Sequence, residues 1–229
     1  MSQDIIFQES EGDNWFNRNR EHLERRGVMT DWPLKLIARH RMSPKRVLEV
    51  GASFGWRLSD IRKNYHSYCL GVEPSRKAIA FGRSHYKDIS FRRGLMHRLP
   101  IHSHKTFDLI IVSFVFHWVD RSTLLRSMSE IDRCLSPGGH LIIADFLPRR
   151  PTKKPYHHLP GKRVFTYKQD YAKMFCFSGL YIEQDRVVFH HATLREGGRI
   201  PSAERAAACC SRNKRGMNTK VKISVRIRS

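Results

Sequence analysis

A glycine-containing turn follows the first strongly apolar run of the chain, and its residue types could bind a ligand. The run RVLEV at 46–50 leads into the turn EVGASFG at 49–55. Glycines let a backbone approach a ligand closely and adopt conformations that a Cβ forbids. In sheets of parallel strands wound with helices, ligands bind beyond the carboxyl ends of the strands. We therefore expect this turn to lie at the functional site.

Two general motifs overlap on this turn and predict different chemistries. A pyrophosphate-binding turn requires G-x-G-x-x-G, and Ser53 occupies the position of its second glycine, so that motif is not met. GASFG does satisfy G-x-S-x-G, the pattern of a serine nucleophile between a strand and a helix. Only 45 mostly helical residues precede the strand, and none forms the glycine-rich loop that an oxyanion hole needs. The hydrolase interpretation therefore stays as a minor alternative that covalent labelling of Ser53 would test.

Several residues that could move a proton follow the later apolar runs. They are His117, Asp145 and, in a later polar segment, Tyr156, His157 and His158. Histidine is the usual general base near neutral pH. Each residue also has a purely structural interpretation. His117 either acts as the base or orders the start of the next helix, and Asp145 either takes part in catalysis or caps a turn.

Two pairs of adjacent histidines raise the question of a metal site. The pairs are His157 with His158 and His190 with His191. The second pair falls in an expected strand at 181–191, where adjacent side chains point to opposite faces and cannot share one ion. We therefore expect no metal.

The elements that must position these residues alternate between strands and helices. We expect strands at 46–50, 68–73, 89–92, 107–116, 140–146 and 181–191. Helices are expected at 54–63, 75–86, 120–135 and 167–177, with Ser75 and Asp120 as N-caps, a turn at SPGG and a surface loop at 148–163. Near-continuously apolar strands alternating with helices are typical of right-handed βαβ units and a parallel sheet covered on both faces. The sequence therefore predicts a doubly wound α/β fold.

The ends of the chain differ from its middle. We expect a helical cover at 1–44, an α/β domain at 45–195, and a basic segment at 196–229 with a possible last strand and a partly disordered tail. Two stretches compete for that strand, 203–211 and 220–228. Of 42 basic side chains, 19 lie after residue 148 against 5 acidic ones, a net charge of +14 there and +7 before it. Such charge attracts polyanions but does not identify a partner.

The remaining composition narrows the class of protein. The chain has 229 residues, 40% of them apolar, which suffices for one domain with extensions. The acidic opening lacks a secretory pattern, and the longest apolar stretch, 109–119, is about half of the roughly 20 residues that a membrane span needs. Five scattered cysteines form neither a disulfide framework nor a zinc knuckle. We expect a cytoplasmic protein with reduced thiols.

Five motifs, in order over residues 45–146, resemble the class I S-adenosylmethionine (SAM)-dependent methyltransferases. VLEVGASFG resembles motif I, E/D-x-G-x-G-x-G, with Ser53 in place of the middle glycine. GVEPS places Glu73 where the family binds the ribose hydroxyls. GLMHRLP resembles the segment beside the adenine, FDLIIVSFVFHWVD resembles motif IV, and LSPGGHLIIADF resembles the strand pair that follows. The resemblance implies a Rossmann-like fold and SAM as the cofactor.

The resemblance also assigns residues. It implies cofactor binding by Glu49, Gly51, Ser53, Gly55, Glu73, Leu95, Met96, Ser113 and Arg18, and catalysis by His117, Asp145 and His157. The chemistry agrees, because a carboxylate at Glu73 can accept two hydrogen bonds from a cis-diol. SAM has no phosphate and carries an ammonium and a sulfonium, which favours an acidic Glu49 and tolerates Ser53.

Two outlying segments resemble a narrower group of bacterial methyltransferases from sugar or polysaccharide pathways. WFNRN, in the N-terminal pattern, would cover the cofactor with Arg18 near its carboxylate, while PYHHLPGKRVFTYKQDY would line the acceptor side with Tyr156, His157, Lys168 and Tyr171. We therefore expect methyl transfer to a hydroxyl or amine of a small polar acceptor, such as a sugar or nucleotide sugar. The alternatives are an RNA methyltransferase and a non-catalytic binding or scaffold protein of the same fold.

Overall fold

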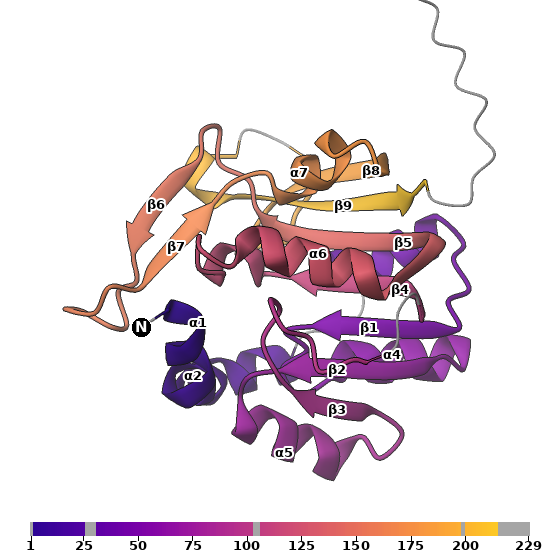
Figure 1. Cartoon of the computed structure of the whole chain (residues 1–229), viewed down its shortest axis with the longest axis horizontal. Helices are drawn as coiled ribbons and strands as arrows, with labels where there is room; N and C mark the ends of the chain where they lie inside the picture. The colour runs from indigo at the N-terminus through magenta and orange to yellow at the C-terminus, as the bar shows by residue number, and fades with distance from the viewer. Residues whose placement is uncertain (1, 26–30, 103–105, 198–199, 215–229) are drawn as a thin grey trace, which may run out of the picture.

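One seven-stranded sheet organises the chain. The computed structural model describes residues 2–25, 31–102, 106–197 and 200–214. The strands are β1 Arg46–Val50, β2 Tyr68–Glu73, β3 Ser90–Arg93, β4 Phe107–Ser113, β5 Leu135–Phe146, β8 Tyr181–His190 and β9 Arg205–Asn213. Their order is β3-β2-β1-β4-β5-β9-β8 (Figure 1). The first five run parallel, and β9 lies antiparallel between β5 and β8. The expected doubly wound, mostly parallel sheet is confirmed.

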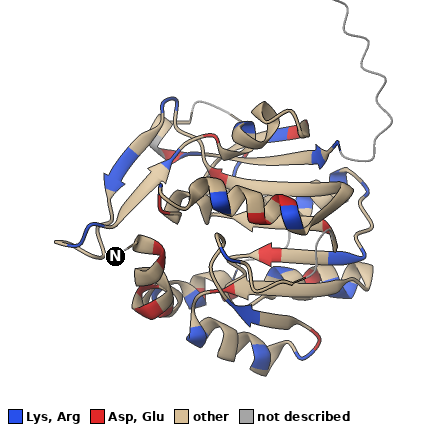
Figure 2. Ribbon diagram, viewed as in Figure 1, with Lys and Arg blue, Asp and Glu red and all other residues tan. Residues whose placement is uncertain are grey.

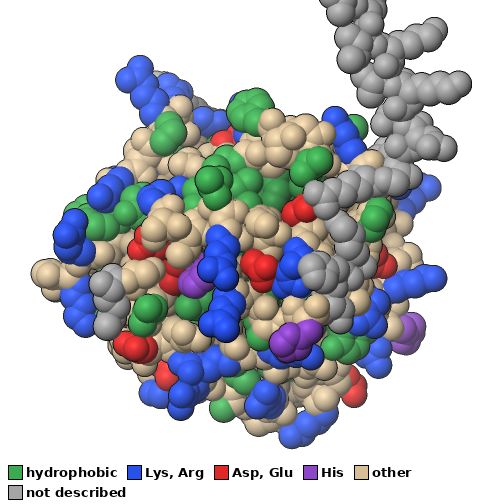
Figure 3. All heavy atoms as spheres, in the orientation of Figure 1, with side chains coloured by type: hydrophobic (Ala, Val, Ile, Leu, Met, Phe, Trp, Pro, Cys, Tyr) green, Lys and Arg blue, Asp and Glu red, His purple; other side chains and the backbone are tan. Residues whose placement is uncertain are grey.

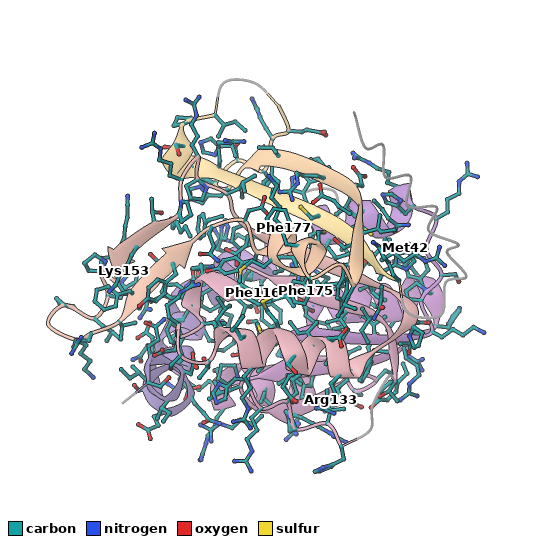
Figure 4. All side chains as sticks on the ribbon, turned by 45° about the horizontal axis from the view of Figure 1, so that its top comes forward. Met42, Phe116, Arg133, Lys153, Phe175 and Phe177 are labelled. Carbon is teal, nitrogen blue, oxygen red and sulfur yellow. The ribbon has the colours of Figure 1, made fainter. Side chains whose placement is uncertain are left out.

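Helices cover both faces of the sheet. One face packs against α3 Trp32–Arg39, α4 Trp56–Tyr65 and α5 Arg76–His85, and the other packs against α6 Leu124–Cys134 and α7 Tyr171–Phe177. Strand side chains alternate between the layers, so Val47 faces the first and Leu48 the second. Phe116 lies in the second layer, its ring centroid 6.0 Å from that of Phe175 on α7 (Figure 4).

The N-terminal residues form a helical segment beside one end of the sheet. It consists of α1 Gln3–Ile6, a π-helical turn η1 Phe7–Glu11 and α2 Gly12–Glu24. Figure 1 shows that the carboxyl ends of β1 and β2 point toward this segment. Phe16 on α2 packs against Phe54 and Phe81, with ring centroids 6.1 and 5.8 Å away. Aromatic contacts of Phe16 therefore help to pack the N-terminal segment against the α/β domain.

The sequence predicted two helix N-caps, and the structure confirms one of them. Ser75 caps α5 as expected, because its side chain accepts a hydrogen bond from the backbone of Ala78 at 3.0 Å. The expectation for Asp120 was wrong, because α6 begins four residues later, at Leu124, with Thr123 at the N-cap. Asp120 instead accepts hydrogen bonds from the backbone amides of Ser122 and Gln3. The Asp120 carboxylate thus binds the backbone of Gln3 in the N-terminal segment and does not cap a helix.

Two segments after β4 differ from the expected elements. The SPGG segment is not a turn between elements but the first part of β5, and the register against β4 shifts between Phe107 and Leu109 to accommodate it. Beyond β5, the expected loop and the start of the expected helix instead form a hairpin. Its strands, β6 Thr152–Pro155 and β7 Phe165–Lys168, pair antiparallel, and α7 begins only at Tyr171, capped by Asp170.

The late strand is β9, close to the first of the two competing stretches. Its small residues at 206–210 are all buried between β5 and β8. The other stretch, 220–228, lies outside the described residues, as does most of the expected tail. All five cysteines are free thiols. Among the described residues, no helix combines the length and apolarity required to cross a bilayer.

Candidate active site

A cavity of about 580 Å³ lies at the carboxyl ends of the central strands. Val50, Glu73 and Ser113, which end β1, β2 and β4, all line it. The N-terminal segment contributes Asp4, Phe7, Gly12, Trp15, Asn19, His22 and Leu23 to its walls, and the β6–β7 hairpin contributes Lys154, Pro155, Thr166 and Lys168. The cavity therefore lies where a doubly wound sheet places its ligand.

The glycine turn after β1 contains two residues with left-handed backbone conformations, which contacts with neighbouring residues stabilise. Gly51 adopts φ +75°, and a Cβ there would meet the Val115 side chain at 2.2 Å. Ser53 adopts φ +48°, a left-handed conformation that costs a non-glycine residue roughly 1 kcal/mol. The Ser53 amide donates to Glu73 Oε2 at 2.9 Å. That hydrogen bond ties the turn to the end of β2 and helps to hold the strained residue.

Glu73 is a carboxylate held by backbone amides at the cavity wall. Its Oε1 accepts from the Ser75 amide at 3.0 Å while Oε2 accepts from Ser53. Burial raises the pKa of the Glu73 carboxyl to about 7, although both amides oppose the rise. Each oxygen retains a further acceptor site. The side chain is therefore oriented and can accept hydrogen bonds from two hydroxyl groups.

Two buried polar atoms of this wall have no hydrogen-bond partner in the part of the chain that the structure describes. They are Glu49 Oε2 and Ser53 Oγ. Both residues line the cavity. A buried carboxylate oxygen without a partner costs several kilocalories per mole of lost hydration unless a donor reaches it. The two atoms therefore indicate a ligand with polar, cationic or hydrogen-donating groups.

Arg57 on α4 lines the cavity and joins two buried carboxylates. Its guanidinium donates to Asp31 Oδ2 at 2.8 Å and Oδ1 at 3.0 Å, and it also contacts Glu49 Oε1. Burial would lower the Arg57 pKa, but the two carboxylates raise it overall, so the residue stays charged. Burial raises the pKa of Glu49 to about 7 against the opposing effect of Arg57. The cluster carries one negative charge more than positive when both carboxyls are ionised.

His117 and Asp145 form a buried pair at the ends of β4 and β5. The His117 ring donates from Nδ1 to Asp145 Oδ1 at 2.8 Å, because a carboxylate can only accept. The His117 amide also donates to Asp145 Oδ2 at 3.2 Å. His117 lines the cavity, whereas Asp145 does not. Asp145 therefore fixes the tautomer that leaves His117 Nε2 free to accept a proton.

A three-residue network connects the N-terminal segment to the loop after β6. The Tyr156 hydroxyl donates to Glu11 Oε1 at 2.7 Å, and the Arg18 guanidinium donates to the Tyr156 hydroxyl at 2.8 Å and contacts Glu11. Glu11 and Tyr156 are buried. We call these three residues the latch, because they join segments separated by about 140 residues at the rim of the cavity.

The structure brings most of the predicted site residues to one cavity. Those that line it are Glu49, Gly51, Ser53, Glu73, Leu95, Met96, Ser113, His117 and His157. Gly55, Arg18 and Asp145 do not line it: Gly55 packs against Phe91, Arg18 belongs to the latch, and Asp145 lies behind His117. Tyr171, expected on the acceptor side, packs instead in the core against Phe116.

Arg57 and the latch carboxylate Glu11 were missed by the sequence interpretation. A signal existed for Arg57, because it lies four residues before the buried Ile61 and so on the apolar face of its helix. No local signal existed for Glu11, whose partners come from distant segments.

The second histidine pair lies at the end of a strand and is engaged by Glu204. β8 ends at His190, so the argument from opposite strand faces was wrong: the rings of His190 and His191 lie parallel with centroids 5.7 Å apart. His190 pairs with the Glu204 carboxylate, and His191 donates from Nδ1 to the Glu204 carbonyl at 3.1 Å. Among the described residues, no group of three histidine, cysteine or carboxylate side chains is placed to hold a metal ion.

The sequence and the structure resemble known proteins. Residues 48–143 match the family model described as "Methyltransferase domain". A malonyl-[acyl-carrier protein] O-methyltransferase of Halalkalibacterium halodurans is 24% identical over 111 residues, 46% of this chain and 40% of that protein. A phthiotriol/phenolphthiotriol dimycocerosates methyltransferase of Mycobacterium leprae is 32% identical over 110 residues, 47% of this chain and 40% of that protein. The matched segment thus spans less than half the length of these two relatives.

Solved structures share the fold at low sequence identity. The Burkholderia thailandensis 1,6-didemethyltoxoflavin-N1-methyltransferase, solved with 1,6-didemethyltoxoflavin and S-adenosylhomocysteine, superposes with a TM-score of 0.68 at 12% identity, covering 91% of this chain and 88% of that one. The N-methyltransferase NodS from Bradyrhizobium japonicum, in complex with S-adenosylhomocysteine, gives 0.56 at 17% identity, covering 79% and 84%. These similarities establish the architecture around the cavity.

Proposed function

The chain belongs to the class I SAM-dependent methyltransferases, and we propose that it transfers a methyl group from SAM to a hydroxyl or amine of a small polar acceptor. The observation that carries the proposal is the carboxylate end of the cavity. There Glu73 is oriented by two backbone amides, and Glu49 presents an oxygen that has no hydrogen-bond partner in the described part of the chain. These groups complement a cationic, phosphate-free adenosyl donor.

The chain's residues fit that donor at separate points. Glu73 retains acceptor sites for the two ribose hydroxyls, and Glu49 Oε2 can accept from the ammonium group. Leu95 and Met96 line the same wall and offer apolar contact for the adenine. When bound, SAM supplies a methyl group on a positively charged sulfur, and attack by an acceptor lone pair on that carbon releases a neutral thioether.

His117 is the residue we assign to proton transfer. A hydroxyl acceptor must lose its proton as its oxygen bonds to carbon, and His117 Nε2 can take it while Nδ1 stays hydrogen-bonded to Asp145. The resulting imidazolium would be stabilised by the buried Asp145 carboxylate. For a neutral amine the base is needed only to remove the proton of the product. His157 lines the exposed rim and is assigned a role in contacting the acceptor.

We infer the chemical class of the acceptor from the cavity lining and from the resemblance of one segment to methyltransferases of sugar pathways. The relatives are named for acceptors as different as a malonyl-acyl carrier protein and a phthiotriol. The basic hairpin and the segment PYHHLPGKR support a small polar acceptor such as a sugar or nucleotide sugar. The test is a panel of such acceptors incubated with the full chain and SAM, with S-adenosylhomocysteine measured by mass spectrometry. Acceptor-dependent product is expected, and donor binding without product from any acceptor would favour the scaffold alternative.

One observation favours an RNA acceptor, the net charge of +14 after residue 148. Figure 3 shows Lys and Arg side chains spread over the visible face rather than gathered in one stripe. A nucleic-acid site predicts binding that weakens steeply as salt rises. If the acceptor is a small molecule, titration with a labelled single-stranded RNA between 50 mM and 200 mM salt should show no binding of this salt-sensitive kind. Binding that weakens steeply over this range would support the RNA alternative.

A further inference from the structure

The cavity is electrically polarised from one end to the other. Its lining carboxylates, Asp4, Glu49 and Glu73, come from the N-terminal segment and from β1 and β2. Arg57 also lines that end, but its charge is paired with both Asp31 and Glu49. Its lining lysines, Lys154 and Lys168, both come from the β6–β7 hairpin. Figure 2 shows acidic residues at the β1 end and basic residues on the hairpin. A cationic donor therefore favours one end, and the other end requires a different kind of ligand.

Lys168 is a partly buried cation without an ion-pair partner among the described residues. Its Nζ lies 3.6 Å from the centroid of the Phe146 ring. Burial and then the charge of Lys154 lower the Lys168 pKa, and Asp145 opposes this only weakly. A cation over an aromatic face recovers part of the lost hydration but supplies no hydrogen-bond acceptor to the ammonium. The site therefore leaves room for an anion.

His191 lies against the same aromatic ring. Its ring centroid is 5.1 Å from that of Phe146, and the His117 ring is 4.8 Å from it. His191 lines the cavity and donates from Nδ1 to a backbone carbonyl, and its Nε2 has no hydrogen-bond partner among residues that the structure describes. Phe146 thus contacts Lys168, His191 and the assigned base, and no carboxylate among the described residues forms an ion pair with Lys168.

We propose that the acceptor carries an anionic oxygen group, a carboxylate or a phosphate, which Lys168 and His191 bind beside His117. This inference rests on the proposed function, because it describes the second substrate of the same cavity. The anion neutralises Lys168, favours a proton on His191 Nε2, and so receives hydrogen bonds from both. Lys154 adds charge at the mouth. A neutral acceptor would leave the Lys168 ammonium desolvated and unpaired.

The test is an anion titration of the full chain saturated with S-adenosylhomocysteine. Inorganic phosphate and acetate are added separately at constant ionic strength, and the histidine ¹³Cε1 signals are followed by NMR, with His191 assigned through His191→Gln. We expect a saturable shift of the His191 signal. A stronger response to phosphate indicates a phosphorylated acceptor, and a stronger response to acetate indicates a carboxylate.

Matched lysine variants decide whether Lys168 is responsible. Lys168→Gln should weaken the anion response about tenfold or more, the usual loss for one charged hydrogen bond. Lys153→Gln is the control, because Lys153 lies on the same hairpin with its Nζ 3.9 Å from the Phe165 centroid but does not line the cavity (Figure 4). It should leave the response unchanged.

The outcomes separate this inference from the proposed function. Retained binding of S-adenosylhomocysteine with no saturable His191 shift, or with the same shift in Lys168→Gln, would overturn the anion site alone. Loss of S-adenosylhomocysteine binding by the unaltered chain would instead overturn the donor site. Because each variant is titrated with S-adenosylhomocysteine first, a misfolded variant is recognised before the anion is added.

Discussion

Glu73 links donor binding to pH. Its pKa is raised to about 7 by burial, so at pH 6 most of the carboxyl is protonated and cannot accept from two hydroxyls and two amides at once. A group whose folded pKa exceeds its unfolded value loses its contribution to stability as pH rises through the folded value. The free protein therefore becomes less stable as pH rises from about 4.5 to about 7, and an adenosyl ligand that requires the ionised carboxyl gains affinity as pH rises through 7.

The first prediction follows from this linkage. Affinity for S-adenosylhomocysteine should rise more than tenfold from pH 6 to pH 8, because ionisation of Glu73 alone gives about tenfold and Glu49, whose pKa burial also raises to about 7, adds to it. Glu73→Gln should bind at least tenfold more weakly at pH 8 and show a rise about tenfold smaller, with the remaining pH dependence due to Glu49. Fluorescence titration at several pH values measures both. An unchanged slope in the variant would remove Glu73 from the donor site.

His117 and Asp145 make a second prediction at the residue scale. His117→Gln should reduce kcat at least a hundredfold for a hydroxyl acceptor, since general-base catalysis contributes roughly that much, and should leave donor affinity within twofold. Asp145→Asn should reduce kcat less, because it acts through the His117 tautomer rather than on substrate. Steady-state kinetics beside donor titration separates the effects. A variant that loses donor binding and kcat together would indicate a structural role for His117.

At the scale of elements, Arg57 couples α4, the start of α3 and β1. Arg57→Met should destabilise the protein by about 3 kcal/mol, because removal of one partner leaves buried carboxylates uncompensated. The loss should be larger at pH 8 than at pH 6, since burial raises the pKa of Glu49 to about 7 and this carboxyl can take up a proton at the lower pH. Lys63→Met on the exposed side of α4 is the control and should change stability by less than about 0.5 kcal/mol. Urea unfolding at both pH values measures the difference, and equal losses would contradict the account.

The latch predicts how the N-terminal segment behaves. Tyr156→Phe removes the hydrogen bonds to Glu11 and from Arg18 while keeping the ring that packs against Trp118. We expect the cover to open more often, with faster proteolysis within residues 2–24 and faster release of S-adenosylhomocysteine. Tyr68→Phe, at the opposite end of the sheet, should change neither rate. If the N-terminal segment is cleaved equally slowly in both variants, the latch does not hold that segment against the cavity.

At the scale of the whole molecule, the sequence predicted what depends on local pattern. The apolar runs of β1, β2 and β4 and the cap at Ser75 required only neighbouring residues. The β6–β7 hairpin was missed because its strands are four residues long, contain Pro155 and three lysines, and are defined by pairing across a loop. Arg57, Asp31 and Glu49 meet only after three elements pack, and the latch joins residues about 140 positions apart. Local pattern could not predict these contacts, whereas the motifs and their order along the chain did predict that the turn, Glu73 and His117 belong to one site, and all of them line the cavity.

The measurement that tests the donor site most directly is calorimetry of the full chain with SAM and with S-adenosylhomocysteine at pH 8. The account predicts saturable heat at one site per chain for both ligands, weakened at least tenfold in Glu73→Ala and unchanged in Lys153→Gln. Absence of heat with either ligand, from protein whose cooperative unfolding shows it to be folded, would contradict it.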